Sequence, residues 1–435
     1  MKIVIVSPYS PRWNNIASVR WEKFAKYLSV GHSVYFITSC FPSKQSFRSF
    51  DLGQTKLVEI PLKYFKYDPH VVVNSKFAKK QTMFSKLLRI IKREIRPVLE
   101  KFLPVSSGGM LLHDYQAYVT ELSKIISDHE RTVLITTYDP WFSLKLGKLF
   151  KKRFPKTVVW LADFRDPSFN LHESVLTKLP VFAYATRRIL AMADVVLVVS
   201  KKMVEDYKRL CGDKVFFLPN GYDGELFLGE CSDDTRENFE IAYTGSFHPG
   251  TRELSSFILA LSRIKEEKRD IYSKLKFIYA GKDYEYVQSL FDKFSMLDIL
   301  ENRGFVSRDE ALRLQAQADL LLLIVYTGED PQEGRSIRTG KVYEYLATGR
   351  PILVIAPRDW EMREEIECDG ISKVFEKSQT EMMADYIEQL FRKRSPVDRK
   401  SREQVIQSYL YESLSKKLEG IIEKITLDES SGKNA

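Results

Sequence analysis

Short apolar runs separated by longer mixed segments recur along the whole 435-residue chain. In the first half the runs are Lys2–Val6, Val34–Thr38, Thr132–Thr136, Val158–Leu161, Val195–Val199 and Val215–Leu218. A second series consists of Glu240–Tyr243, Leu275–Tyr279, Asp319–Val325 and Pro351–Ile355. Buried parallel strands that alternate with helices give this pattern. We therefore predict an α/β protein with two parallel sheets.

Many of the predicted strands end in small or polar residues, as in VSP, ITS, ITT, LAD, VVS, YTGS and YAGK. In an open parallel sheet the carboxyl ends of the strands form the ligand-binding edge, where such residues belong. Two sheets of this kind that face each other are expected to share one cleft.

A Pro-Asn-Gly turn within Leu218–Asp223 interrupts the strand signal, and the second series of strands follows it. We predict a first domain at 1–218 and a second domain at 219–400. A final helical segment, about Ser401–Ile425, is expected to cross back onto the first domain. Residues 401–435 are thus interpreted as a C-terminal helix with a short tail.

Most of the net charge of +9 is concentrated in Lys76–Lys101, which holds nine basic and two acidic residues. Apolar residues at helical spacing accompany this charge: Phe84, Leu87, Leu88, Ile91 and Ile95. The combination indicates an interfacial helix that docks reversibly on an anionic membrane surface. An ordinary packed helix with a solvated basic face is the alternative. Nucleic acid is not expected as a partner, because no recognised binding module accompanies the charge.

Three further features indicate the compartment. The six-residue apolar stretch at the N-terminus is too short for a signal peptide, and the longest apolar run elsewhere, Leu320–Tyr326, is too short to span a bilayer. The four cysteines are widely spaced, as is typical of reduced thiols. We expect a cytoplasmic protein, peripheral at most on the inner face of the cell membrane.

The strongest chemical signal is the segment TGKVYEYLATGRPIL, residues 339–353. Gly340 before a helical stretch leaves first-turn N–H groups open to an anion, and Lys341 adds a positive charge there. Glu344 lies one turn further along the same face, within reach of a ribose diol. The spacing of the glycines and Val342 exclude a P-loop. The alternative is an amphipathic helix with a surface Lys and Glu.

Several segments in a fixed order carry a family resemblance. They are GHSVYFITS (31–39), LPNGYD (218–223), AYTGSF (242–247), IYAGK (278–282), RGFVSRDEALRLQAQADLLLL (303–323) and GKVYEYLATGRPIL (340–353). In this order the chain resembles the GT-B glycosyltransferases, specifically family 4, over nearly its whole length. The resemblance implies two Rossmann-like domains facing each other across a cleft, with the acceptor bound by the first and a nucleotide diphosphate sugar by the second.

The resemblance also implies roles for residues of the second domain. A glycine turn and a following basic residue meet the donor diphosphate, a second turn and a backbone segment flank the base, and a glutamate holds the ribose. The residues placed at the donor are Gly245, Ser246, Arg252, Gly281, Lys282, Val306, Ser336, Gly340, Lys341 and Glu344. Arg252 and Lys341 are the expected catalytic residues, because they would stabilise the leaving diphosphate. A surface helix charge is the alternative for Arg252.

The chain departs from the family in three places. Ser336 stands where the family's first glutamate touches the transferred sugar. Asn14 and Asn15 replace a Gly-Gly pair, and Arg20 on the following helix either faces the diphosphate or is exposed to solvent. A short His-containing motif near the sugar is replaced by a segment that makes three residues candidates for sugar or acceptor contact: Asp163, Arg165 and Asp166. In the alternative, Asp166 caps a helix and pairs with Arg165.

Together these features predict a glycosyltransferase that moves a sugar from a nucleotide diphosphate sugar to a lipid-linked or free glycan in bacterial surface polysaccharide synthesis. The resemblance implies retention of configuration without a metal ion or other cofactor, and no clear Asp-x-Asp metal motif follows a predicted strand. A nucleotide-sugar epimerase of the same architecture and a non-catalytic nucleotide-sugar binder are the alternatives.

Overall fold

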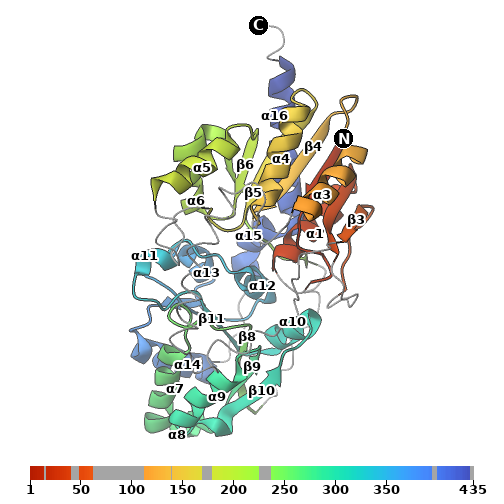
Figure 1. The fold of residues 1–435 in the computed structure, drawn as a ribbon. Coiled ribbons are helices and arrows are strands. Elements are labelled where there is room, and N and C mark those ends of the chain that lie inside the picture. The colour runs from red at the N-terminus through yellow and green to blue at the C-terminus, as the bar shows by residue number, and fades with distance from the viewer. Residues whose placement is uncertain are drawn as a thin grey trace. The chain divides into compact units, whose positions relative to one another are not determined.

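The computed structural model describes residues 1–13, 16–40, 49–61, 112–138, 140–168, 179–224, 237–393 and 399–431. The described chain divides into two compact units (Figure 1). Unit 1 contains the residues up to Asn220 and those from Tyr411 onward, and unit 2 contains Gly221–Leu410. The polypeptide therefore leaves unit 1 and returns to it at its C-terminal end.

Unit 1 is built on a seven-stranded parallel sheet with the order β3-β2-β1-β4-β5-β6-β7. Its strands are β1 Lys2–Val6, β2 Ser33–Cys40, β3 Lys56–Pro61, β4 Thr132–Tyr138, β5 Val158–Phe164, β6 Val195–Val198 and β7 Val215–Phe217. The central strand β1 pairs with β2 through Lys2↔Ser33 and with β4 through Lys2↔Thr132. The reversal of strand order at β1 makes this a doubly wound sheet.

Helices cover both faces of this sheet, because each strand is apolar at successive positions. They are α1 Ile16–Leu28, α3 Leu112–Ile125, α4 Phe142–Arg153, α5 Pro180–Leu190, α6 Lys201–Cys211 and α16 Tyr411–Ser431. Val4 and Val6 face the core that contains α4, whereas Ile3 and Ile5 face α1 and α16. The helices α1 and α16 come from opposite ends of the chain and pack against each other (Figure 1).

Unit 2 contains a six-stranded parallel sheet with the order β10-β9-β8-β11-β12-β13. Its strands are β8 Phe239–Thr244, β9 Leu275–Ala280, β10 Leu300–Gly304, β11 Leu320–Ile324, β12 Ile352–Ile355 and β13 Lys373–Phe375. The accompanying helices are α7 Ser255–Glu267, α8 Arg269–Tyr272, α9 Tyr284–Lys293, α10 Arg308–Gln317, α11 Pro331–Gly334, α12 Gly340–Thr348, α13 Arg363–Glu367, α14 Thr380–Lys393 and α15 Arg399–Tyr409.

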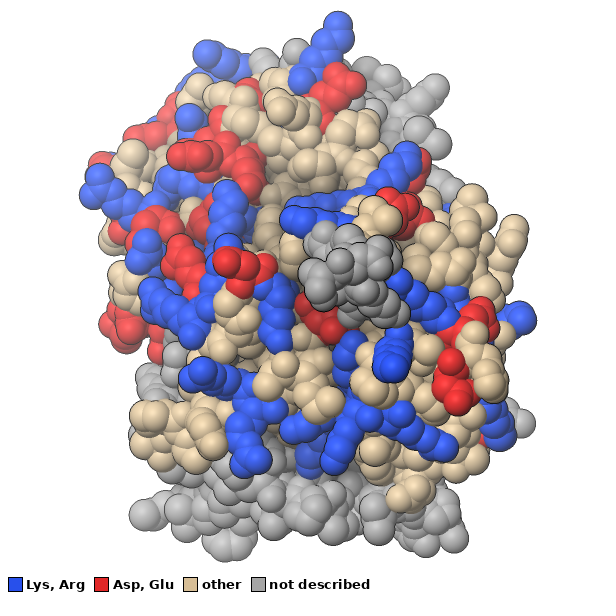
Figure 2. Space-filling view, turned by 90° about the horizontal axis from the view of Figure 1, so that it is seen from above, with Lys and Arg blue, Asp and Glu red and all other residues tan. Residues whose placement is uncertain are grey.

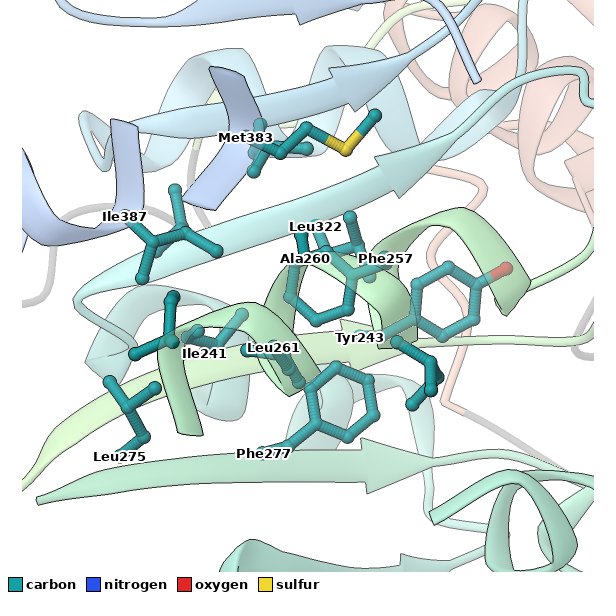
Figure 3. Close-up of a cluster of buried hydrophobic side chains, with 14 of the residues drawn as sticks. Ile241, Tyr243, Phe257, Ala260, Leu261, Leu275, Phe277, Leu322, Met383 and Ile387 are labelled. Atoms are coloured by element: carbon teal, nitrogen blue, oxygen red, sulfur yellow. The ribbon is translucent and has the colours of Figure 1, made fainter. Parts of the chain in front are cut away.

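The two faces of the unit 2 sheet have separate cores. On one face Ile241 and Phe277 of the sheet pack against Phe257 of α7 and Ile387 of α14 (Figure 3). The other face contacts α10, α12, α13 and α15 through buried residues such as Val342. Because α12 is held against the sheet by this second core, its first turn has a fixed position beside the carboxyl ends of the strands.

Every apolar run predicted as a strand is a strand, but three strands of the described residues were not predicted. These are β3, β10 and β13, and each lies at an edge of its sheet. An edge strand has only one neighbour and is partly exposed, so it does not need a continuous apolar run. In β10 the sequence LENRG has no fully buried residue, which explains why apolar periodicity did not indicate it.

The predicted helix at 401–425 consists of two helices, α15 and α16, which meet at Leu410. Tyr409 packs on Tyr343 in unit 2, with ring centroids 4.8 Å apart. Tyr411 packs on Phe24 in unit 1, with centroids 5.5 Å apart. Two aromatic residues separated by one position thus belong to different cores, and the helical segment is divided between them.

The basic segment Lys76–Lys101 lies outside the described residues, and so do Asn14 and Asn15. On the face of the molecule drawn in Figure 2, basic and acidic side chains of the described part are mixed at the upper left, whereas basic side chains predominate below the centre. Within the described ranges, no helix is both long and apolar enough to cross a bilayer. The membrane-docking helix therefore stays a prediction.

Candidate functional site

Two glycine turns meet at the carboxyl ends of neighbouring strands in unit 2. Gly245 follows β8 and has φ of +133°, a conformation that favours glycine. Its N–H donates to the carbonyl of Ala280 over 2.7 Å, and its own carbonyl accepts a hydrogen bond from the Tyr279 hydroxyl over 3.2 Å. A Cβ atom on Gly281 would lie 2.1 Å from the Gly245 carbonyl oxygen. Both turns therefore require glycine for their close approach.

Lys341 extends from the first turn of α12 to the Gly245 turn. A Cβ atom on Gly245 would lie 2.4 Å from the Lys341 Nζ. The ammonium group lies 4.3 Å from the centroid of the Tyr243 ring, and its nitrogen is buried without a hydrogen-bond partner. The structure thus brings together Gly245, Gly281 and Lys341, although Gly245 and Lys341 are 96 residues apart in the sequence.

The start of α12 is open in the way that anion-binding helix termini are. Thr339 is the N-cap residue, but its side chain makes no capping hydrogen bond, and its hydroxyl is buried without a partner. Val342 N–H turns back to the Thr339 carbonyl over 3.2 Å. Amide groups at a helix start combine with the helix dipole to favour an anion.

Arg252 adds a second cation beside Lys341. It lies in a loop before α7, where its backbone forms a two-way bridge with His248 at N···O distances of 3.0 and 2.8 Å. This position excludes the alternative of a surface helix charge. The Arg252 Nε is buried without a hydrogen-bond partner. The positive charge of Arg252 lowers the pKa of Lys341, so the two cations are close together, and no ion pair joins either of them to a described carboxylate.

The electrostatic consequence is visible at Lys341. Burial and, to a lesser extent, the positive charge of Arg252 lower the pKa of its ammonium group to about 7, while the negative charge of Glu344 opposes this shift. A buried ammonium group without an anionic partner is destabilised in its charged form. An anion bound beside Lys341 and Arg252 would offset the repulsion between their positive charges. It would also accept the hydrogen bonds that their buried nitrogens lack.

Glu344 is buried on α12 and forms an ion pair with Arg308. Arg308 is a site residue that the sequence did not indicate. A basic residue in the first turn of a helix is unfavourable to the helix dipole, and this misplacement at the start of α10 is the signal that could have pointed to a specific partner. The other carboxylate oxygen of Glu344, Oε2, forms no side-chain hydrogen bond with another described residue.

The remaining predicted donor residues belong to the same unit. Lys282 lies 4.8 Å from the centroid of the Phe305 ring, which is 65% exposed and precedes the half-buried Val306. The Ser246 carbonyl accepts a hydrogen bond from the Tyr243 hydroxyl over 3.1 Å. Ser336 is half-buried in the turn between α11 and α12, and Gly340 is the first residue of α12.

In unit 1, Arg20 and Asp163 are completely buried and form an ion pair over 2.8 Å. Arg20 also donates to the carbonyls of Leu218 and Pro219, over 2.9 and 2.6 Å. The Trp21 indole donates to the other carboxylate oxygen of Asp163 over 2.8 Å. The pair therefore fixes the segment at the end of unit 1, and the alternative of a solvent-exposed Arg20 is wrong. A substrate contact by either residue stays a prediction.

Arg165 and Asp166 follow β5 at the same edge of the unit 1 sheet. The Arg165 guanidinium stacks on Tyr9, 5.0 Å from the ring centroid, and its Nε is buried without a hydrogen-bond partner. Asp166 is exposed. No ion pair joins the two within the described ranges, so the predicted structural alternative, in which Asp166 pairs with Arg165, is not present.

Metal-ligating residues do not cluster in the part of the chain that the structure describes. No group of three or more His, Cys, Asp or Glu side chains lies close enough together there to hold an ion. Lys341 and Arg252 supply positive charge beside the Gly245 turn.

The sequence matches no protein-family model and no curated protein. The fold is similar to that of sucrose-phosphate synthase from Thermosynechococcus elongatus, with a TM-score of 0.67, 13% identity and coverage of 98% of this chain and 99% of that one. It is also similar to Anabaena HepE in complex with UDP and glucose, with a TM-score of 0.60, 12% identity and coverage of 98% and 100%. Trehalose-6-phosphate synthase, studied for glycosyl transfer with retention, matches with a TM-score of 0.60, 11% identity and coverage of 98% and 99%.

These similarities establish the fold. The chain has the α/β fold of the GT-B glycosyltransferases, with one parallel sheet in each of its two units.

Proposed function

We propose that the chain is a retaining glycosyltransferase of family 4 that takes its sugar from a nucleotide diphosphate sugar. The observation that carries this proposal is a pair of neighbouring cationic groups, Lys341 at the Gly245 turn and Arg252, whose buried nitrogens have no ion-pair partner among the described residues. A diphosphate supplies the missing charge and the missing acceptors. UDP bound by HepE, a protein of the same fold, supports a nucleoside diphosphate as the occupant.

The two parts of the donor would be bound by one helix. Lys341 and the open N–H groups at the start of α12 would hold the diphosphate, and Glu344 would accept hydrogen bonds from the ribose hydroxyls. The base would be flanked by Lys282 and Val306, together with the exposed Phe305, whose ring centroid lies 4.8 Å from the Lys282 ammonium group. Unit 1 would bind the acceptor.

In the proposed reaction the bond between the anomeric carbon and the β-phosphate oxygen breaks, and its electron pair stays on the phosphate. A new bond forms between that carbon and an acceptor hydroxyl oxygen, and the hydroxyl proton leaves to the released nucleoside diphosphate or solvent. Lys341 and Arg252 would stabilise the negative charge that develops on the leaving diphosphate. Preorganised charges of this kind make a large contribution to catalysis. Because the chain provides these two charges itself, we propose that the reaction needs no metal ion or further cofactor.

The acceptor we propose is a lipid-linked glycan of bacterial surface polysaccharide synthesis, at the cytoplasmic face of the cell membrane. The concentration of basic residues in Lys76–Lys101 supports this. Free glycan is the simpler alternative acceptor.

The test is a screen of nucleotide sugars for binding by thermal shift, followed by product analysis of the best donor with and without polyprenyl-diphosphate sugars, in the presence of EDTA. Transfer to the acceptor under these conditions is the expected result. A changed sugar in the absence of acceptor would identify an epimerase. Tight binding without turnover would identify a non-catalytic binder. This outcome is tested because Ser336 replaces the family's glutamate that contacts the transferred sugar.

A further inference from the structure

Three basic side chains stand apart from the other buried cations of the described chain. Arg165, Arg252 and Lys341 each have a buried nitrogen without a hydrogen-bond partner, and no hydrogen bond or ion pair joins the rest of their charged groups to another described residue. Arg20, Arg131 and Arg338 are instead held by hydrogen bonds to main-chain or side-chain oxygens. Two members of the first set form the proposed diphosphate site in unit 2, and the third lies in unit 1.

The position of Arg165 is that of a binding residue. It directly follows β5, and Tyr9 is in the loop after β1, so both lie at the carboxyl edge of the sheet, where ligands bind in parallel α/β folds. Stacking on Tyr9 fixes one face of the guanidinium and leaves its N–H groups in the plane. The plane is held before a ligand arrives, so little side-chain freedom is lost on binding.

The nearby negative charges do not neutralise Arg165. Asp163, two residues earlier, is buried and already paired with Arg20. Asp166 is exposed and forms no ion pair with Arg165 in the described ranges. In the loop that contains Tyr9, Arg12 is paired with Glu59 through two hydrogen bonds of 2.9 and 3.1 Å. Among the described residues, Arg165 is therefore a half-buried positive charge without an ion-pair partner.

We propose that Arg165 binds an anionic group, a phosphate or a carboxylate, on the acceptor. The guanidinium fork suits such oxygen groups because it can donate two parallel hydrogen bonds. The inference rests on the proposed transferase function and narrows it, since the acceptor becomes a negatively charged glycan rather than a neutral one. A diphosphate-linked or phosphorylated sugar and a sugar acid share this chemistry.

The experiment uses the full-length protein, saturated with the nucleoside diphosphate that binds it best, so that Lys341 and Arg252 are occupied. A hexose 6-phosphate, a hexuronic acid and the free hexose are then titrated by isothermal calorimetry. We expect at least one charged sugar to bind about 10-fold or more tightly than the free hexose, and Arg165→Gln to remove this advantage. The two charged sugars distinguish a phosphate from a carboxylate. Arg209→Gln, at an exposed arginine of α6 in the same unit, is the matched control and should bind as the unmodified protein does.

Several results would overturn the proposal. The first is equal binding of charged and free hexose by the unmodified protein. The second is that Arg165→Gln still binds the charged sugar more tightly than the free hexose by the same factor. The third is a 10-fold loss of nucleoside diphosphate affinity in that variant, which would place Arg165 at the donor. If Arg165→Gln does not fold, Arg165→Lys keeps the charge but not the fork, and must weaken the advantage. Failure of the transferase function itself would be seen separately, as absent nucleoside diphosphate binding by the unmodified protein.

Discussion

At the scale of single residues, the candidate donor site is defined by charges that lack partners. Lys341 lies where a Cβ atom on Gly245 would collide with it, so the glycine is needed for the position of the lysine. The sequence indicated both residues, because a glycine at a strand end and a Gly-Lys pair at a helix start are local patterns. The unfavourable position of Arg308 in the first turn of its helix is also local, but its pairing with Glu344, 36 residues away, could not be predicted from a local pattern. For the same reason the sequence could not show that Arg20 is held by Asp163, 143 residues away.

The lowered pKa of Lys341 gives a pH dependence to donor binding. In the free protein this pKa is about 7, and a bound diphosphate should raise it by favouring the ammonium form. Above pH 7 binding must then be coupled to proton uptake, and affinity should fall about 10-fold per pH unit until the pKa of the complex is reached. Calorimetry at pH 8 in buffers of different ionisation enthalpy should show uptake approaching one proton per nucleoside diphosphate.

The matched control for this coupling is Lys341→Arg, because a guanidinium remains charged at pH 8 and takes up no proton. Lys341→Ala should lose affinity for the nucleoside diphosphate but little affinity for the free nucleoside. Binding without proton uptake by the unmodified protein, or undiminished diphosphate affinity in Lys341→Ala, would show that the lysine does not contact the phosphates.

Glu344 is expected to recognise the ribose. Replacing it with alanine should weaken binding of the free nucleoside by roughly 1.5 to 3 kcal/mol, since hydrogen bonds to a charged group are lost. The unmodified protein should also bind 2′-deoxyribonucleotides more weakly than ribonucleotides, and the variant should bind the two alike. Fluorescence or calorimetric titration would measure this, with Glu310→Ala on the partly exposed side of α10 as control. Equal affinity for the two sugars in the unmodified protein would remove the assignment.

At the scale of elements, the interior strands were predictable and the edge strands were not. Strands such as β4 and β5, buried at every position, appear as apolar runs in the sequence. In β13 the free edge at Val374 is instead covered by side chains of α13: Val374 N–H donates to Glu367 over 3.0 Å, and Arg363 donates to the Val374 carbonyl over 2.8 Å. Such a strand is defined by its neighbours, and its three residues carry too little pattern of their own.

The packing of α4 on β5 depends on one glycine. A Cβ atom on Gly147 would lie 2.1 Å from the Trp160 indole nitrogen, which donates to the Thr136 hydroxyl over 2.9 Å. Gly147→Ala should therefore lower the free energy of unfolding by about 1 to 3 kcal/mol through overpacking, although alanine is the better helix former. Urea denaturation measures the effect.

Gly420 in α16 is the matched control, because a Cβ atom there would meet nothing within 4 Å. Gly420→Ala should raise the free energy of unfolding by up to about 1 kcal/mol. The pair of substitutions separates close packing from helix propensity. A stabilising effect of Gly147→Ala would mean that α4 can move away from Trp160 at little cost.

At the scale of the whole molecule, the uneven charge predicts where the protein is found. If Lys76–Lys101 docks on anionic lipid, the protein should sediment with vesicles that contain phosphatidylserine or phosphatidylglycerol and dissociate as salt is raised above about 0.15 M. Changing Lys86, Arg89, Lys92 and Arg93 to glutamine should weaken this binding, because each basic residue near the surface contributes about 1 kcal/mol. Four glutamine substitutions at the exposed Lys201, Lys202, Lys208 and Arg209 are the control. Equal sedimentation of both variants would argue for a soluble acceptor.

The return of the chain to unit 1 has a consequence for biosynthesis. The core between α1 and the sheet contains Trp21 and Phe24, and it is completed by Tyr411, Leu418 and Ile422 of α16. On the ribosome this helix is made only after all of unit 2, so the N-terminal unit must wait with an uncovered apolar face while the later one folds. We expect nascent chains that stop before Tyr411 to be bound by chaperones and degraded, whereas the continuous segment of unit 2 could mature on its own. A frameshift or premature stop in α16 would thus lead to degradation of the whole chain, because the core of unit 1 stays incomplete.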